Sequence, residues 1–205
     1  MKKQGSAAAD PHKFTAKRAG RIVLAAVPVA IAATVVLGGV ANGAVPVSFA
    51  ISGSQFKISA SELDGTSFSQ YAGVTKDDKG GAHQVAIANI GDATLTNMCQ
   101  SVVSDTPLGK VGVKITAGGG GNPVQAKGLQ IGMTDLKGDA TFTDIRIGLD
   151  ASTVRTDAKG SPGDFSQDSQ GIKITSLQQT AWSTTAAVFT LNGMHVQLTN
   201  GDECF

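Results

Sequence analysis

Beyond residue 46, apolar and polar side chains alternate in short runs, and this two-residue period leaves few folds open. The clearest runs are Val111–Ile115, Leu129–Met133 and Met194–Leu198. Because successive side chains of a β-strand point to opposite faces, such runs predict strands with one buried face. No stretch beyond residue 46 has an apolar stripe of helical period. We therefore expect residues 46–205 to form an all-β domain of about ten strands.

A weak internal repeat leaves two β architectures open. Similar strings lie at Ile90–Met98, Leu136–Ile145 and Ala187–Met194. Repeats of about 20–50 residues are typical of stacked folds such as the β-solenoid. Similar hairpins within one sandwich would produce the same three degenerate copies. We predict a sandwich or curved β-roll, with a β-solenoid as the alternative.

The N-terminal part has a different composition. Residues 1–21 carry six basic side chains, and residues 22–45 then run for 24 positions without a charge. A bilayer core about 30 Å thick needs roughly 20 apolar helical residues, so residues 22–45 are predicted to form one transmembrane helix. The positive-inside rule places residues 1–21 in the cytoplasm and residues 46–205 outside it. The basic residues are Lys2, Lys3, Lys13, Lys17, Arg18 and Arg21.

Two fates are open for this segment: a retained signal anchor or a cleaved signal peptide. A secretory signal has an apolar region of about 7–15 residues and an A-x-A-like cleavage site. Here the apolar region is longer, the sites Gly39–Ala41 and Ala41–Gly43 are imperfect, and Pro46 disfavours cleavage directly after it. We expect an anchored protein with its N-terminus inside, with secretion after cleavage as the alternative.

The predicted exterior domain is mildly acidic. It carries 11 Lys and Arg against 15 Asp and Glu, a net charge near −4, and its basic residues are scattered. Because nucleic-acid binding requires clustered basic side chains to neutralise phosphates, we expect no nucleic-acid partner.

Only two cysteines occur, Cys99 and Cys204, and both lie in the predicted exterior domain. An even pair in an oxidising compartment indicates a disulfide. The bond would close a loop of roughly 100 residues, which the chain-entropy model values at about 4.7 kcal/mol. Two separate buried thiols are the alternative. We expect no metal site, because no histidine or second cysteine lies at ligand spacing.

Catalytic motifs are missing from the sequence. The Gly-x-Ser-x-Gly motif of esterases is absent, and the nearest string, Gly160–Gly163, lacks its spacing. His83 and His195 are interpreted as unpaired surface residues, and Trp182 as a core residue. We therefore assign no catalytic, cofactor-binding or metal-binding residue and expect no cofactor. A long polar segment, Asp150–Gln170, is interpreted as a mobile surface excursion, with a lid or binding loop as the alternative.

Six short sequence segments of the predicted exterior domain are similar to those of a known family. They are Ser48–Gly53, Ser61–Gly65, Met98–Val102, Gly138–Ile145, Gln179–Trp182 and Glu203–Phe205. They resemble an actinobacterial family of signal- or anchor-bearing envelope proteins, a domain of unknown function often labelled automatically as cholesterol esterase. The resemblance implies a cell-envelope location and a small multi-pass membrane protein as partner. Both cysteines lie within matching strings, which favours the disulfide. Relatives often have Ala-rich cleavage sites, whereas this chain has Val45-Pro46-Val47.

These observations predict a non-catalytic extracytoplasmic protein of the cell envelope. A sheet with one apolar face offers a surface for a lipid or for a membrane or envelope partner. One alternative is a lipid or sterol ester hydrolase, which would need His83 or His195 beside a serine and an acid. A second alternative is a self-assembling surface structural protein.

Overall fold

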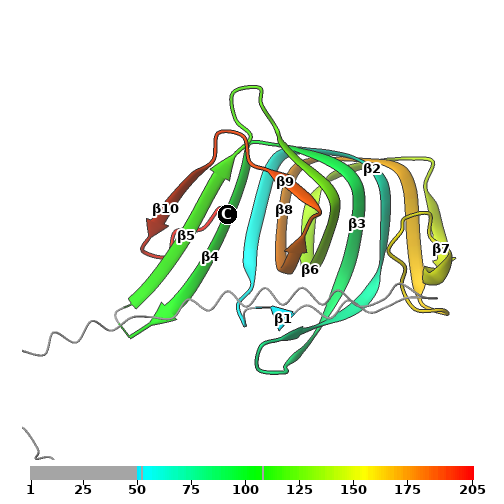
Figure 1. The fold of residues 1–205 in the computed structure, drawn as a ribbon, viewed down its shortest axis with the longest axis horizontal. Coiled ribbons are helices and arrows are strands. Elements are labelled where there is room, and N and C mark those ends of the chain that lie inside the picture. The colour runs from blue at the N-terminus through cyan, green and yellow to red at the C-terminus, as the bar shows by residue number, and fades with distance from the viewer. Residues whose placement is uncertain (1–49, 52, 108) are drawn as a thin grey trace, which may run out of the picture. The chain divides into compact units, whose positions relative to one another are not determined.

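The computed structural model describes residues 50–51, 53–107 and 109–205, which form ten strands and one short 3-10 helix (Figure 1). The prediction of an all-β domain is confirmed. The predicted segments 1–21 and 22–45 lie outside the described residues. Within the described ranges, no helix is long and apolar enough to cross a membrane. The elements are β1 (Ala50–Ile51), β2 (Phe56–Asp77), β3 (Ala82–Thr96), β4 (Met98–Thr106), β5 (Gly109–Ala117), β6 (Val124–Thr143), β7 (Arg146–Asp150), η1 (Ala151–Thr153), β8 (Phe165–Thr185), β9 (Val188–Thr190) and β10 (His195–Thr199).

Four long antiparallel strands close into a ring. β2 pairs with β3, β3 with β6, and β6 with β8. The ring closes where Phe56–Ala60 of β2 pairs with Leu177–Ala181 of β8. β2 and β8 are 22 and 21 residues long, so strand twist accumulates along them until their ends meet.

The predicted sandwich and the alternative solenoid are wrong, because the strands form one continuous sheet. The predicted curved β-roll is corrected in one respect, since the curled sheet closes into a four-stranded barrel. Irregular positions help it to bend. The β6–β8 register shifts between Lys137 and Asp139, where Gly138 and the facing Ser176 both have positive φ. A β-bulge of this kind bends the strand and increases its local twist. The repeated strings lie at the ends of strands and the turns that follow them, so they mark similar turns.

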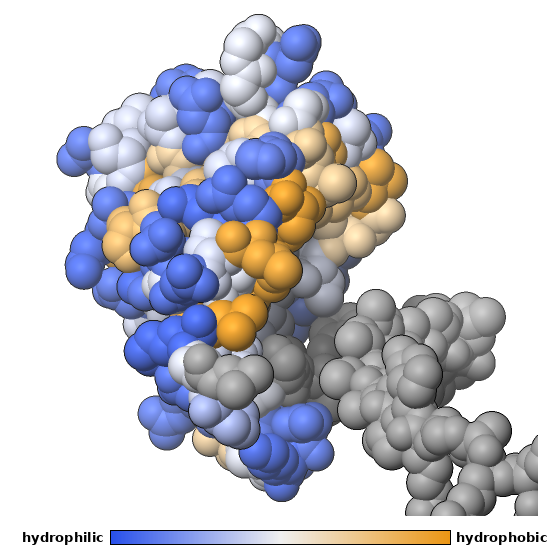
Figure 2. Space-filling view, turned by 90° about the vertical axis from the view of Figure 1, so that its left-hand side faces the viewer, coloured by the Kyte–Doolittle hydropathy of each residue, from blue (hydrophilic) through white to orange (hydrophobic). Residues whose placement is uncertain are grey.

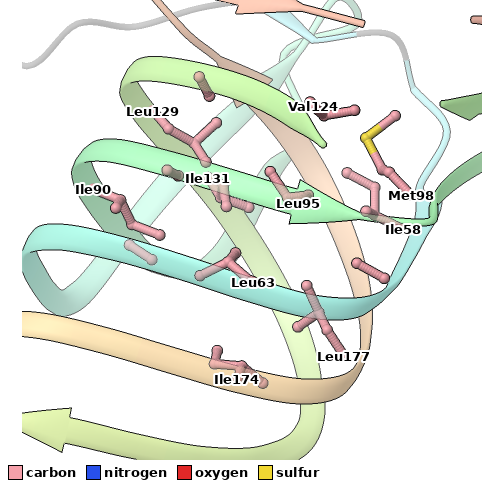
Figure 3. Close-up of a cluster of buried hydrophobic side chains, with 14 of the residues drawn as sticks. Ile58, Leu63, Ile90, Leu95, Met98, Val124, Leu129, Ile131, Ile174 and Leu177 are labelled. Carbon is pink, nitrogen blue, oxygen red and sulfur yellow. The ribbon is translucent and has the colours of Figure 1, made fainter. Parts of the chain in front are cut away.

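The core fills the inside of the ring. Figure 3 shows the apolar side chains of β2, β3, β6 and β8 pointing toward one another. Each of them is at most 5% exposed, which indicates close packing. The labelled core residues are Ile58, Leu63, Ile90, Leu95, Met98, Val124, Leu129, Ile131, Ile174 and Leu177.

Three further strands extend the sheet beyond the ring. The order β10-β5-β4-β2 places β10 at the outer edge, and we call β4, β5 and β10 the flap. Figure 1 shows the flap standing to the left of the ring. β7 pairs with β8 on the other side of the sheet order, and β9 pairs with β6.

Residues 151–164 fold over the outer face of β2. Gln70 lines the ring interior, so the neighbouring Ser69 and Tyr71 point outward. Val154 of this segment is buried, and the hydroxyls of Ser69 and Thr156 are 2.5 Å apart. Gly160 packs so closely on the Tyr71 ring that an added Cβ would lie 2.9 Å from it. The segment expected to be a mobile excursion is therefore packed on the sheet, and β8 already begins at Phe165.

Candidate functional site

The C-terminal tail covers one face of the flap, which we call the back face. Cys99 of β4 forms a disulfide with Cys204, confirming the predicted pair. The Cys204 backbone N–H donates to Ser101 Oγ at 3.0 Å. Because Cys99 and Ser101 are two residues apart in one strand, both contacts lie on the same face.

Two lysines add polar contacts between the back face and the tail. The Lys57 ammonium lies 2.7 Å from a Glu203 carboxylate oxygen and 5.2 Å from the centroid of the Phe205 ring. The Lys114 ammonium donates to the Glu203 carbonyl at 3.1 Å. The back face is thus occupied by the chain's own last residues.

The opposite face of the flap is apolar, and we call it the front face. It consists of two cross-strand rows that continue from β2. One row runs Phe56–Val102–Val113–Leu198, and the other runs Ile58–Gln100–Ile115–Val196. Gln100 is the one polar member of these rows, and the directly opposed apolar side chains interact across neighbouring strands. The front face therefore presents apolar residues from four strands.

This face continues the core, and none of the described residues covers it. Nearest the ring, Met98 and Ala117 face each other and are 1% and 5% exposed. Exposure then rises outward to 42% at Val111, 49% at Val196 and 77% at Leu198. Figure 2, which looks from the side of the flap, shows a hydrophobic band between hydrophilic side chains. Contiguous exposed apolar patches of this type mark interaction surfaces.

A second apolar feature is a shallow cleft of about 330 Å³ beside β2 and β3, which we call the β2–β3 cleft. Phe165, 63% exposed, lies at this cleft, and Gln167 Nε2 donates to Gln70 Oε1 at 2.8 Å. Gln70 also lines the cavity inside the ring. That cavity measures only about 60 Å³, less than half of the roughly 150 Å³ that holds a benzene molecule. The cleft is lined by Gln70, Tyr71, Ala72, Val85, Ala86, Phe165 and Gln167.

The two histidines differ from each other. The prediction that His83 is unpaired is wrong: its Nε2 lies 3.0 Å from Asp77 Oδ2, and its ring stacks on Trp182 with centroids 3.7 Å apart. The hydrogen bonds from His83 and from the Gly81 backbone hold the pKa of Asp77 below its usual value. Trp182, expected in the core, is half-buried in this stack. His195 is exposed in β10, as predicted.

The His83–Asp77 pair supplies two of the three groups that the hydrolase alternative requires. Among the residues that the structure describes, no serine hydroxyl is hydrogen-bonded to the His83 ring. His195 lies in β10, whereas His83 lies in β3. The His195 side chain points to the back face, since Val196 points to the front face. Within the described residues, His83 thus has an acid partner but no hydrogen-bonded serine.

The strongest electrostatic cluster lies near the start of β8. The Asp168 carboxylate is fully buried and accepts hydrogen bonds from Arg146 at 2.6 and 2.9 Å and from Arg155 at 3.0 and 3.2 Å. These guanidinium groups hold the pKa of Asp168 far below its ordinary value. Arg155 also bridges to Asp144 at 2.6 Å. The cluster ties β8 to the adjoining loop and is satisfied internally.

Sequence reasoning found only part of the front face. The alternating runs Val111–Ile115 and Met194–Leu198 supplied two of its strands, and the disulfide residues were identified. Phe56 and Val102 were missed, because neither stands in a clear alternating run. Their place in the first row depends on the pairing of β2 with β4.

Comparison with known families finds that a model described as a family of unknown function (DUF6230) matches residues 52–205. No curated protein and no solved structure matches the chain. Because the function of this family is unknown, the match assigns no activity to the chain. A function can be proposed only from the geometry of the structure.

Proposed function

The chain belongs to the DUF6230 family of unknown function, and from its geometry we propose a non-catalytic, extracytoplasmic envelope protein that binds a membrane-protein partner through the front face. The uncovered continuation of the core across β4, β5 and β10 carries this proposal. A sheet face patterned for burial and left open on one side is suited to an apolar partner surface.

The energetics favour binding at the outer part of the front face. Fully burying a Val or Leu side chain that was exposed stabilises a complex by about 1.5–3 kcal/mol. The Leu198 and Val196 side chains are 77% and 49% exposed in the isolated chain. Much of this burial free energy can therefore still be gained when a partner covers them. The half-buried Val113 and Ile115 would form the centre of the contact.

Two observations support a location outside the cytoplasm. Disulfides persist in oxidising compartments, and the Cys99–Cys204 bond ties the tail to the domain. The uncharged stretch 22–45, preceded by six basic residues, has the length of a membrane span. A membrane-anchored domain would meet its partner at the membrane surface.

The test is photo-cross-linking in intact cells that express the full chain. A photoreactive amino acid replaces Val111 on the front face in one strain and the neighbouring Lys110 in the other. Alternation places position 110 on the back face, and Lys110 makes an exposed ion pair with Asp105. We expect a cross-link to an integral membrane protein from position 111 and none from position 110.

Equal cross-linking from both positions would contradict the proposal, because it would show proximity without a face-specific contact. Adducts of lipid mass alone from position 111 would also contradict it, and would indicate that the front face rests on the bilayer. Loss of the specific band in the Leu198→Lys variant would link the contact to the outer rows.

A second candidate function is the binding of a slender lipid chain in the β2–β3 cleft. Its volume of about 330 Å³ lies at the lower end of the range for ligand sites, roughly 300–1,000 Å³. Phe165 offers an exposed aromatic side chain there, and Ala72 and Ala86 leave room for an apolar chain. The filled ring directs such a ligand to this surface cleft.

A further inference from the structure

We propose that the β10 edge pairs with β10 of a second copy, so that the flaps of two chains join into one sheet. β10 is the outermost strand of the sheet order, with β5 as its neighbour on one side. No other strand of the described residues pairs with its second edge, which therefore presents backbone N–H and C=O groups for pairing. This inference concerns the strand edge and does not require the partner proposed for the front face.

As far as the structure describes the chain, the β10 edge has none of the lysines, prolines or bulges that normally prevent strand addition. Natural edge strands are blocked by lysines, prolines, bulges or covering segments. The five residues His195–Thr199 include no lysine, arginine, aspartate, glutamate or proline. Their pairing with β5 runs without a register shift. The strand is therefore regular enough to act as a template for another strand.

The pattern of β10 suits pairing with itself. An antiparallel arrangement about a two-fold axis at Gln197 places Val196 opposite Leu198 of the other copy, and His195 opposite Thr199. Apolar residues then face apolar residues on the front face, and polar residues face polar residues on the back face. A two-fold contact of this kind uses the same surface on both chains and closes at two copies.

The exposure of the two apolar residues in β10 also supports a second copy of this chain as the partner. Leu198 and Val196 are the outermost residues of the two front-face rows. In the paired form each row would continue across the axis into the row of the second chain. Cross-strand apolar pairs of this type stabilise a sheet. The front face would become one continuous apolar surface of six flap strands.

The experiment measures the mass of the full 205-residue chain in detergent micelles by sedimentation, with the detergent contribution subtracted. The variant Val196→Lys/Leu198→Lys places lysines on the edge and in both opposed pairs. Both residues are exposed, so the fold tolerates the change. The control is Val111→Lys, which adds one lysine, half the charge of the double variant, to the front face of β5 away from the edge. Hydrogen exchange of the β10 amides is followed at low and high protein concentration.

We expect a wild-type mass of twice the 20.8 kDa chain, a monomer for the double lysine variant and a dimer for Val111→Lys. Amides of β10 should exchange more slowly at high concentration. A wild-type monomer at every concentration would overturn the inference. So would a dimer that survives the two edge lysines, equal loss of the dimer in Val111→Lys, or a series of larger oligomers. Unchanged exchange in β10 would place any dimer contact elsewhere, for instance in the N-terminal segment.

Discussion

Asp168 illustrates how a single residue organises the end of β8. Its carboxylate is fully buried, yet both guanidinium partners, Arg146 and Arg155, are partly exposed. The Arg155 backbone N–H adds a further bond to the same carboxylate at 2.8 Å. A buried charge is tolerated only when it is paired and hydrogen-bonded, as it is here. Removing the Asp168 charge should therefore lower the stability of the fold by a large amount, even though the ion pair contributes only a modest net stabilisation.

We predict that Asp168→Asn lowers the free energy of unfolding at pH 7 by about 3 kcal/mol, near the low end for a broken buried pair because both arginines reach solvent. The pKa of Asp168 in the folded chain lies below its unfolded value. Its stabilising effect is therefore present above about pH 4 and is lost as the pH falls further. Urea denaturation between pH 7 and pH 2 should show the two proteins converging at low pH.

The surface variant Asp105→Asn serves as the control, since its ion pair with Lys110 is exposed. Its denaturation midpoint should match that of the wild type. A midpoint for Asp168→Asn that also matches the wild type at pH 7 would show that the cluster does not stabilise the fold.

At the scale of elements, the flap owes its two different faces to the C-terminal tail. The tail follows β10 and returns across the back face to Cys99, so the two sides of one sheet meet different surroundings. Lys57 of β2 and Lys114 of β5 both reach Glu203, which fixes the tail over the middle of the flap. The front face has no such cover among the described residues and stays available for binding.

We predict that Cys99→Ser/Cys204→Ser lowers the free energy of unfolding by about 2–5 kcal/mol, because the bond links residues 105 apart in the sequence. Chemical denaturation of the oxidised wild type and the variant measures this difference. Ser101→Ala is the matched control: it removes only the hydrogen bond to the Cys204 N–H, and about 1 kcal/mol is expected. Equal midpoints for all three proteins would exclude a stabilising role for the attached tail.

At the scale of the whole molecule, closure of the ring decides where a ligand can bind. Four strands enclose a space that their own side chains fill, leaving about 60 Å³. The small size of this cavity favours binding surfaces outside the ring, such as the front face of the flap and the β2–β3 cleft. Closure also pairs residues near 56–60 with residues near 177–181, a separation that makes the folding of this topology slow.

If the second candidate function is correct, native mass spectrometry of the full chain should detect a bound lipid mass that the Phe165→Asp variant loses. Phe165 is exposed, so this change alters the cleft without disturbing the core. Val188→Asp is the matched control, because Val188 of β9 is also an exposed apolar residue but does not line the β2–β3 cleft. Loss of the lipid in both variants, or in neither, would contradict binding in this cleft.

The features that depend only on residues close together in the chain could be predicted from the sequence. The alternation in Val111–Ile115 and Met194–Leu198 predicted strands and their apolar face, because side-chain direction in a strand follows from position alone. The pairing of Cys99 with Cys204 followed from there being only two cysteines. Alternation does not say which strand lies beside which, so the rows that join Phe56 and Val102 to the flap depended on the sheet order.

The closed ring and the open front face arise from contacts between strands that are distant in the sequence. Ring closure depends on twist accumulated over β2 and β8 and on the bulge at Ser176, which no local pattern reveals. The pairing of His83 with Asp77 was missed because a hairpin brings together side chains that the sequence alone does not orient. Whether an apolar face is core or binding surface depends on what covers it, and that is a property of the assembled sheet.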